Sequence, residues 1–224
     1  MQYNLPQSPV RGIPLKSRSV RGFYASTRWP RTIAHESNLE RDFLILCDFD
    51  TNVRQVTEQP CKITYPSEGG KDRNYTPDFF LDVVAEVGPP QLVEIKFQSE
   101  LDQRADEYVE RFIAARDYAK SRGWEFKVKT ERDIRGDQLA NAKFLLPYRR
   151  LPVDHGRSVR WMRTLATTAP CKVETALHDA WHNDEKERLR ALTELWRLVA
   201  MGNVSVDWEA GRVGLQSLVW PNDR

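Results

Sequence analysis

The chain has 224 residues, of which 40% are hydrophobic and 29% are charged, and its formal net charge is +2. This composition is typical of a folded globular protein and excludes a disordered or low-complexity chain. The longest uninterrupted apolar run, residues 43–47, is far shorter than the roughly 20 residues that cross a bilayer, so we expect no membrane segment. The N-terminus lacks the apolar region of a secretory signal, and the bacterial cytoplasm is the expected location.

Cysteine and histidine spacing argues against two common kinds of site. Cys47, Cys61 and Cys171 are odd in number and form no Cys-x-x-Cys pair, so neither a disulfide framework nor a zinc site is indicated. His178 and His182 have the i, i+4 spacing of metal ligands, but no Glu-x-x-His sequence accompanies them. The sequence also lacks a glycine loop ending in Lys-Ser/Thr, so any nucleotide hydrolysis must come from a partner.

The first 34 residues are predicted to form a basic flexible arm. No acidic residue precedes Glu36, while positive charges occur among Pro, Gly and Ser at Arg11, Lys16, Arg18, Arg21, Arg28 and Arg31. Such a segment suits DNA phosphate or an acidic partner surface, and it fits a solvated, disordered terminus equally well. The sequence leaves both interpretations open.

Residues 35–148 are predicted to form one α/β domain. A helix is expected over residues 36–49, because Leu39, Phe43 and Cys47 recur at helical spacing. Turns rich in Gly and Pro then separate several extended stretches, and a long amphipathic helix leads to a last strand. The strands are expected at residues 53–58, 61–65, 75–84 and 92–97, the helix at 101–122 and the last strand at 124–130.

Residues 149–224 have a hydrophobic pattern of their own and are predicted to form a second, small domain. Helices are expected near residues 158–167, 172–181 and 185–201, followed by a hairpin that turns at 209–211 and returns through 213–215. Three helices and a hairpin favour a winged-helix-like domain. Another small helical accessory domain is the alternative.

The strongest chemical signal is Thr76-Pro77-Asp78 followed by Glu94-Ile95-Lys96. Alternate side chains of a strand share a face, so Glu94 and Lys96 project together while Ile95 points into the core. Asp78 begins the neighbouring strand, where its carboxylate can meet that of Glu94. Glu40 on the preceding helix can add a third carboxylate, although each acid alone fits a solvated surface charge.

Carboxylates in this arrangement are typical of metal-dependent phosphodiester hydrolysis. Their oxygens hold Mg²⁺, or Mn²⁺ in its place, and leave coordination positions for water and phosphate. Glu40, Asp78 and Glu94 are therefore the candidate metal ligands, and a third acid is compatible with two ions about 4 Å apart. Lys96 is expected to orient the water or to stabilise charge on the phosphate. The pattern predicts a Mg²⁺-dependent endodeoxyribonuclease.

Four motifs, in this order, resemble the TnsA endonuclease family: Ser37-Asn38-Leu39-Glu40, Glu58-Gln59-Pro60, Tyr75-Thr76-Pro77-Asp78-Phe79 and Val93-Glu94-Ile95-Lys96. The resemblance covers roughly residues 36–134. It implies a restriction-endonuclease-like (PD-(D/E)xK) core whose catalytic positions are Glu40, Asp78, Glu94 and Lys96. Some members carry Gln at the position of Glu94. Gln59 matches a family position near the site. The sequence does not decide whether it forms a hydrogen bond in the site or supports a turn.

The resemblance also implies partners. Members of this family cut the 5′ ends of a transposon during cut-and-paste transposition, while the DDE transposase TnsB cuts and joins the 3′ ends and the ATPase TnsC regulates the reaction. Double-stranded transposon-end DNA, a TnsB-like transposase and a TnsC-like ATPase are therefore the expected partners, and a CRISPR-associated transposon fits as the source. The C-terminal region of the family is winged-helix-like and contacts DNA or TnsC.

Two other interpretations of the same residues stay open. A stand-alone nuclease of this fold, such as a resolvase or a restriction enzyme, would need no transposase for activity. A winged-helix DNA-binding adaptor would use the acidic residues only for structure. Metal binding separates the nucleases from the adaptor, because only a nuclease is expected to gain thermal stability with Mn²⁺.

Overall fold

The computed structural model of the chain describes residues 5–10, 21–67, 70–182 and 185–222. The chain divides into two compact units, residues 1–135 and 136–224. This boundary precedes the predicted one at 148/149, because helix α5 (Asp137–Leu145) and the 3-10 helix η1 (Leu146–Arg150) pack against α8 (Glu185–Ala200) of the second unit. Among the described residues, no helix is long and apolar enough to cross a membrane.

The first unit is built on a mixed four-stranded sheet, which confirms the predicted α/β class. Its strand order is β3-β6-β7-β8. Antiparallel pairing joins β3 to β6 and β6 to β7, and parallel pairing joins β7 to β8. These strands span Val53–Glu58 (β3), Phe79–Val83 (β6), Gln91–Ile95 (β7) and Glu125–Lys129 (β8).

Two helices connect the parallel strands β7 and β8, where the sequence predicts one. Helix α2 (Gln98–Gln103) ends at Arg104, whose φ of −124° and ψ of 30° depart from helical values, and α3 (Ala105–Ser121) begins directly after it. Gly123, with a φ of 71°, follows the end of α3 in the left-handed conformation that glycine adopts without steric cost. The short helix α4 (Glu131–Ile134) follows β8.

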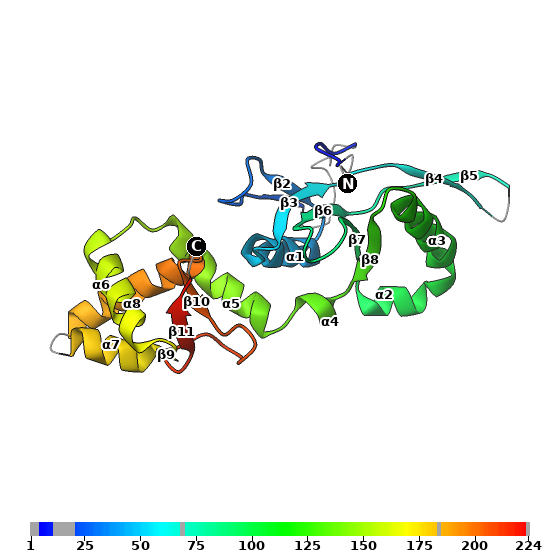
Figure 1. Ribbon diagram of the computed structural model, residues 1–224. Coiled ribbons are helices and arrows are strands. Elements are labelled where there is room, and N and C mark those ends of the chain that lie inside the picture. Colours follow the sequence, from blue (N-terminus) through cyan, green and yellow to red (C-terminus); the bar gives the residue numbers. More distant parts are fainter. Residues whose placement is uncertain (1–4, 11–20, 68–69, 183–184, 223–224) are drawn as a thin grey trace. The chain divides into compact units, whose positions relative to one another are not determined.

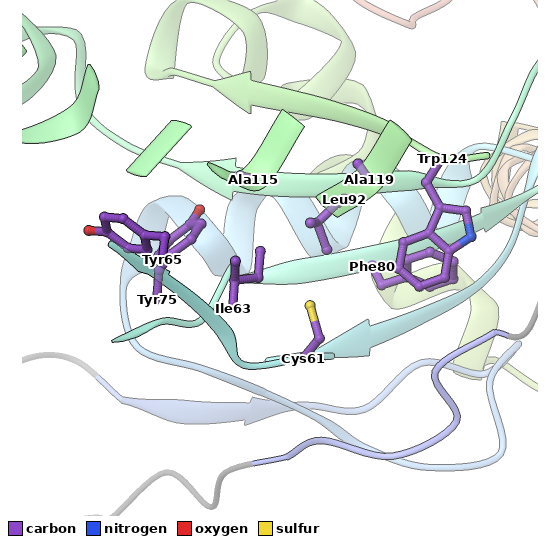
Figure 2. Close-up of a cluster of buried hydrophobic side chains, with 9 residues drawn as sticks. All are labelled: Cys61, Ile63, Tyr65, Tyr75, Phe80, Leu92, Ala115, Ala119 and Trp124. Atoms are coloured by element: carbon purple, nitrogen blue, oxygen red, sulfur yellow. The ribbon is translucent and has the colours of Figure 1, made fainter. Parts of the chain in front are cut away.

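Neighbouring aromatic residues of β6 pack on opposite faces of the sheet, so helices cover both faces (Figure 1). Phe79 contacts Phe43 of α1 (Asn38–Phe49), with ring centroids 5.8 Å apart. Phe80 belongs instead to a buried cluster that includes Ala115 of α3 (Figure 2). The ribbon formed by β4 (Ile63–Pro66) and β5 (Asp72–Tyr75) closes this second face and contributes Ile63, Tyr65 and Tyr75 to the cluster.

Residues 21–35 are folded, which differs from the predicted flexible arm. Strands β1 (Gly22–Tyr24) and β2 (Ile33–His35) pair antiparallel, and the Tyr24 hydroxyl donates a 2.7 Å hydrogen bond to Asp48. Arg31 forms a 2.6 Å ion pair with Glu58. Part of the basic charge thus binds the protein itself, while the rest of it, Arg11, Lys16 and Arg18, lies outside the described residues.

Arg28 is the residue of this segment with the most contacts to the backbone. Its Nη1 donates to the carbonyl oxygens of Asp48 at 2.7 Å and Asp50 at 2.9 Å, and its Nη2 donates to Val53 at 2.7 Å. Asp48 belongs to the last turn of α1, where carbonyls lack helical partners and a cation is favourable. Arg28 therefore caps α1 and ties it to β3.

Arg28→Ala is expected to lower the free energy of unfolding by about 2 kcal/mol, because charge-assisted hydrogen bonds to carbonyls are lost. Urea denaturation followed by circular dichroism measures this difference. Arg54→Ala on β3 is the matched control, since it removes an exposed arginine next to Val53, one of the residues that Arg28 contacts. Equal stability of the two variants would mean that residues 21–35 contribute little to the fold.

In its described residues the second unit contains, after α5 and η1, three further helices and a three-stranded antiparallel sheet. The elements follow the order α6 (His155–Thr168), β9 (Cys171–Lys172), α7 (Val173–Trp181), α8, β10 (Val204–Val206) and β11 (Leu218–Pro221). In the sheet β11 lies between β10 and β9. Trp161 is fully buried among the helices and donates its Nε1 hydrogen to the carbonyl of Ala191 at 2.7 Å.

The helices lie where the sequence places them, but the return strand of the predicted hairpin does not. It forms at Leu218–Pro221 and not at residues 213–215. Asn141 of α5 holds the intervening segment, since it accepts a hydrogen bond from the Val213 backbone N–H at 2.9 Å and donates to the Gly211 carbonyl at 2.8 Å. This contact spans about 70 residues of sequence, so hydrophobic alternation does not reveal it.

Candidate active site

The candidate site lies where β6 begins and β7 ends. Asp78 immediately precedes β6, and its Oδ2 accepts a 2.7 Å hydrogen bond from the backbone N–H of Ile95. The pairing of Phe79 with Val93 puts Asp78 beside the last residues of β7. The side chain of Asp78 is 22% exposed, so solvent and ligands can reach a carboxylate whose position the sheet fixes.

Glu94 is the most deeply buried of the predicted catalytic residues. It is 2% exposed, and both carboxylate oxygens have partners. Its Oε1 lies 2.8 Å from Lys96 Nζ, and its Oε2 accepts a 2.6 Å hydrogen bond from the Tyr75 hydroxyl. Tyr75 therefore fixes the orientation of Glu94 from the neighbouring ribbon.

Lys96 connects the two carboxylates. Its Nζ lies 2.8 Å from Glu94 Oε1 and 3.9 Å from Asp78 Oδ2, and it also donates to the Ile95 carbonyl at 3.1 Å. The side chain is 19% exposed, so the ammonium remains accessible. An acid, a cation and a second acid thus stand together at one end of the sheet.

Glu40 has a structural partner of its own. It is the third residue of α1, and its Oε2 accepts a 2.7 Å hydrogen bond from the Glu36 backbone N–H, while Ser37 Oγ accepts from the Glu40 N–H at 3.1 Å. This reciprocal pattern is close to a capping box, which stabilises the start of a helix. Glu40 nevertheless belongs to the same electrostatic group, because it interacts with both Asp78 and Lys96.

The pKa values reflect this crowding of like charges. Burial raises the pKa of Asp78 well above its usual range, and repulsion from Glu94 and Glu40 adds to the rise while Lys96 opposes it. Burial also raises the pKa of Glu40, against the hydrogen bonds that it accepts. Burial alone would lower the pKa of Lys96, but the carboxylates of Asp78 and Glu94 raise it above its usual value. The raised pKa therefore keeps Lys96 charged at neutral pH.

The donor chemistry of the site fits Mg²⁺ or Mn²⁺, which prefer carboxylate oxygens. A bound cation would also relieve the repulsion that raises the pKa of Asp78. In the part of the chain that the structure describes, no three His, Cys, Asp or Glu side chains form a ready-made metal-binding group. Asp78 and Glu94 are the two predicted ligands that lie beside the Lys96 ammonium, whereas Oε2 of Glu40 is engaged by the Glu36 N–H at the start of α1.

Gln59 lies beside the site and has an unusual backbone conformation. It is the one described residue other than glycine with a positive φ, 42°, a conformation that costs a non-glycine residue free energy. Its backbone N–H donates to the Asp78 carbonyl at 2.8 Å, and its Nε2 donates to Glu36 Oε1 at 3.4 Å. The side chain is 8% exposed, and its Oε1 has no hydrogen-bond partner within the described residues.

Gln59→Gly is expected to keep or raise the melting temperature and to reduce DNA cleavage. Glycine adopts the positive φ without strain, which offsets the loss of the side chain, whereas a buried amide oxygen beside the site is removed. Thermal unfolding and a cleavage assay on the same samples measure both effects. A variant that unfolds more easily but cuts normally would show that Gln59 only supports the turn.

Sequence reasoning left Tyr75 without a role, although it stands within one of the motifs. Its contact with Glu94 joins two residues 19 positions apart, and only the packing of the β4–β5 ribbon against the rest of the unit brings them together. A sequence signal existed, because a buried tyrosine requires a partner for its hydroxyl. The identity of that partner depends on the fold.

The comparisons with known proteins concern this same region. A search of curated proteins finds no match to the chain. Residues 50–131 match the family model described as TnsA-like endonuclease N terminal. The matched segment runs from just before β3 to the first residue of α4 and contains Asp78, Glu94 and Lys96, whereas Glu40 precedes it. The part of the chain that carries the core of the candidate site is therefore similar to the TnsA-like endonuclease N-terminal domain.

Proposed function

We propose that the protein is a Mg²⁺-dependent DNA endonuclease that cuts the 5′ ends of a transposon. The observation that carries the proposal is the contact of Lys96 with both Asp78 and Glu94, at the end of a mixed sheet and within the segment similar to TnsA-like endonucleases. Two carboxylates and a fixed cation suit phosphodiester hydrolysis, in which negative charge grows on the phosphate. A restriction-endonuclease-like core agrees with the α/β class of the unit.

Asp78 and Glu94, with Glu40 as a third ligand, would hold one or two Mg²⁺ ions. When bound, the metal supplies Lewis-acid polarisation of the phosphate and acidifies a water molecule. The residues of the chain then have distinct roles. Asp78 is positioned by the Ile95 N–H and Glu94 by Tyr75, so neither carboxylate needs to reorganise during the reaction.

Lys96 stabilises charge during hydrolysis and does not transfer a proton. Water adds to phosphorus and the bond from phosphorus to the leaving oxygen breaks, while the water gives up a proton to the surrounding solvent and the leaving oxygen takes one from it. Additional negative charge develops on the phosphate oxygens during this step. A permanent ammonium beside them lowers the free energy of that state. The raised pKa of Lys96 keeps it charged throughout the neutral pH range.

We also propose that the second unit is a winged-helix-like module that contacts transposon-end DNA or a TnsC-like ATPase. From α6 onward its element order of helix, strand, helix, helix, strand and strand, with the last strand in the middle of the sheet, supports this assignment. The first half of α8 is accessible, since Leu189 is 64% exposed, whereas its second half is buried. A contact through α8 would therefore use residues 185–193.

Cleavage of end-labelled transposon-end DNA in Mg²⁺ or Mn²⁺ tests the proposed function. Wild type and Asp78→Ala are compared with and without a TnsB-like transposase. We expect 5′-strand cuts that require both Asp78 and the transposase. Cuts that need Asp78 alone would instead identify an independent nuclease, and the absence of Asp78-dependent cutting in every mixture would favour a DNA-binding adaptor.

A further inference from the structure

Arg111 of α3 lies beside the candidate site and between two tyrosine rings. Its Cζ is 5.5 Å from the ring centroid of Tyr75 and 5.1 Å from that of Tyr108. The Tyr75 hydroxyl in turn donates to Glu94, and Tyr108 interacts electrostatically with Lys96. Figure 2 shows Tyr75 at the end of the buried cluster opposite Trp124. Tyr75 thus contacts the guanidinium of Arg111 through its ring and the carboxylate of Glu94 through its hydroxyl.

The guanidinium of Arg111 is restrained by aromatic rings and forms no ion pair with the described residues. Its Nε is buried and has no hydrogen-bond partner, and no acidic side chain lies within ion-pair distance of it, in either case among the described residues. Glu107, one turn earlier on α3, forms its ion pair with Arg104 at 2.5 Å and interacts with Arg111 only at longer range. Stacking on the two rings restrains the side chain, and the N–H groups remain available for a ligand.

A cation in this position would offset the repulsion between DNA phosphates and the carboxylates of the site. DNA phosphates must approach a site that contains three carboxylates, and Lys96 is already shared between two of them. An arginine restrained by aromatic rings loses little conformational freedom when it binds, and its planar fork matches two phosphate oxygens. A second fixed cation beside the site therefore favours the approach of the DNA strand.

We propose that Arg111 binds a backbone phosphate of the DNA strand that is cut, next to the phosphate at Lys96. The inference rests on the proposed function and adds a substrate-binding residue to it. Tyr75 then has two roles, because it orients Glu94 through its hydroxyl and supports Arg111 through its ring face. The phosphate subsite and the hydrolytic centre share one side chain.

The test measures DNA affinity of the full-length protein as a function of salt, by fluorescence anisotropy of a labelled duplex in EDTA. Arg111→Ala is expected to weaken binding about 5-fold and to reduce the slope of log K against log salt by about 0.9, the value for one lost phosphate contact. Arg111→Lys is expected to recover most of the slope, since it keeps the charge. Melting temperatures establish that each variant is folded.

Arg116→Ala is the matched control. Arg116 is an exposed arginine on the same helix, five residues further on, so its loss changes the net charge equally on a different side of α3. If Arg111→Ala and Arg116→Ala have the same DNA affinity and the same salt dependence of binding, Arg111 does not contact a phosphate. This conclusion would hold even if wild type cuts DNA in an Asp78-dependent manner. Wild type that neither binds nor cuts DNA would overturn the proposed function and this inference together.

Discussion

Asp78→Asn is expected to abolish metal-dependent cleavage while the first unit stays folded. The amide oxygen can still accept the hydrogen bond that Ile95 donates at 2.7 Å, so the local backbone is retained. The negative charge that would bind Mg²⁺ is lost, and so is one of the two carboxylates beside Lys96. We expect the cleavage rate to fall at least about 1000-fold, as for removal of an essential electrostatic group.

The stability of Asp78→Asn should differ from wild type in a pH-dependent way. The pKa of Asp78 is higher in the folded state than in the unfolded state, where it is about 3.9. The contribution of Asp78 to the free energy of unfolding is therefore fully present below the unfolded-state pKa and is lost as pH rises through the folded-state pKa. In EDTA, wild type should therefore lose stability over this window, and Asp78→Asn should lose less. Melting temperatures at pH 5 and pH 8 measure the difference.

Metal addition gives a second readout for the same variant. Mn²⁺ at 100 times its dissociation constant stabilises a folded protein by about 2.7 kcal/mol. Wild type should show an increase in melting temperature, and Asp78→Asn a much smaller one. Asp106→Asn, an exposed acid on α3, serves as the control and should respond like wild type. Normal cutting by Asp78→Asn would remove Asp78 from the active site.

Local patterns in the sequence were sufficient to predict the part of the site at the end of β7, where Lys96 directly follows the strand. Alternation along residues 92–97 predicts that Glu94 and Lys96 share a face, and the 2.8 Å contact between them agrees with this. Apolar neighbours such as Val93 and Ile95 made that strand recognisable. The mixed α/β class followed from the same periodicity, because helical and extended patterns alternate through the first unit.

Contacts between distant segments could not be predicted in this way. Arg28 looked like part of a flexible basic arm, yet its hydrogen bonds reach the carbonyls of Asp48, Asp50 and Val53. The sequence shows that Arg28 is charged, but it does not show which carbonyl groups lie within hydrogen-bond distance of it in the folded chain. The role of Glu40 is also ambiguous in the sequence Ser37-Asn38-Leu39-Glu40. A glutamate at this position can cap the start of the helix or bind a metal ion. In the structure its hydrogen bond to the Glu36 N–H serves the cap.

Lys96→Met is the second change with a large expected effect, and it separates charge stabilisation from metal binding. Methionine has a similar length without the ammonium, so the cleavage rate should fall about 100-fold or more. The carboxylates of Asp78 and Glu94 remain, and the cation that now lies 2.8 Å from Glu94 no longer competes for them. The Mn²⁺-dependent increase in melting temperature should therefore be equal to that of wild type or larger.

Without metal, the same variant should be less stable than wild type at neutral pH. The pKa of Lys96 is raised by the two carboxylates, so its contribution to stability is fully present at neutral pH and is lost only in strongly alkaline solution. Lys127→Met on β8 is the matched control, since Lys127 pairs at 3.0 Å with Glu125, a half-exposed residue. Lys96→Met that cuts as fast as Lys127→Met would contradict the role of Lys96. If Lys96→Met loses both the Mn²⁺-dependent increase in melting temperature and the cleavage activity, the ammonium is instead needed to hold the carboxylates of Asp78 and Glu94 in position.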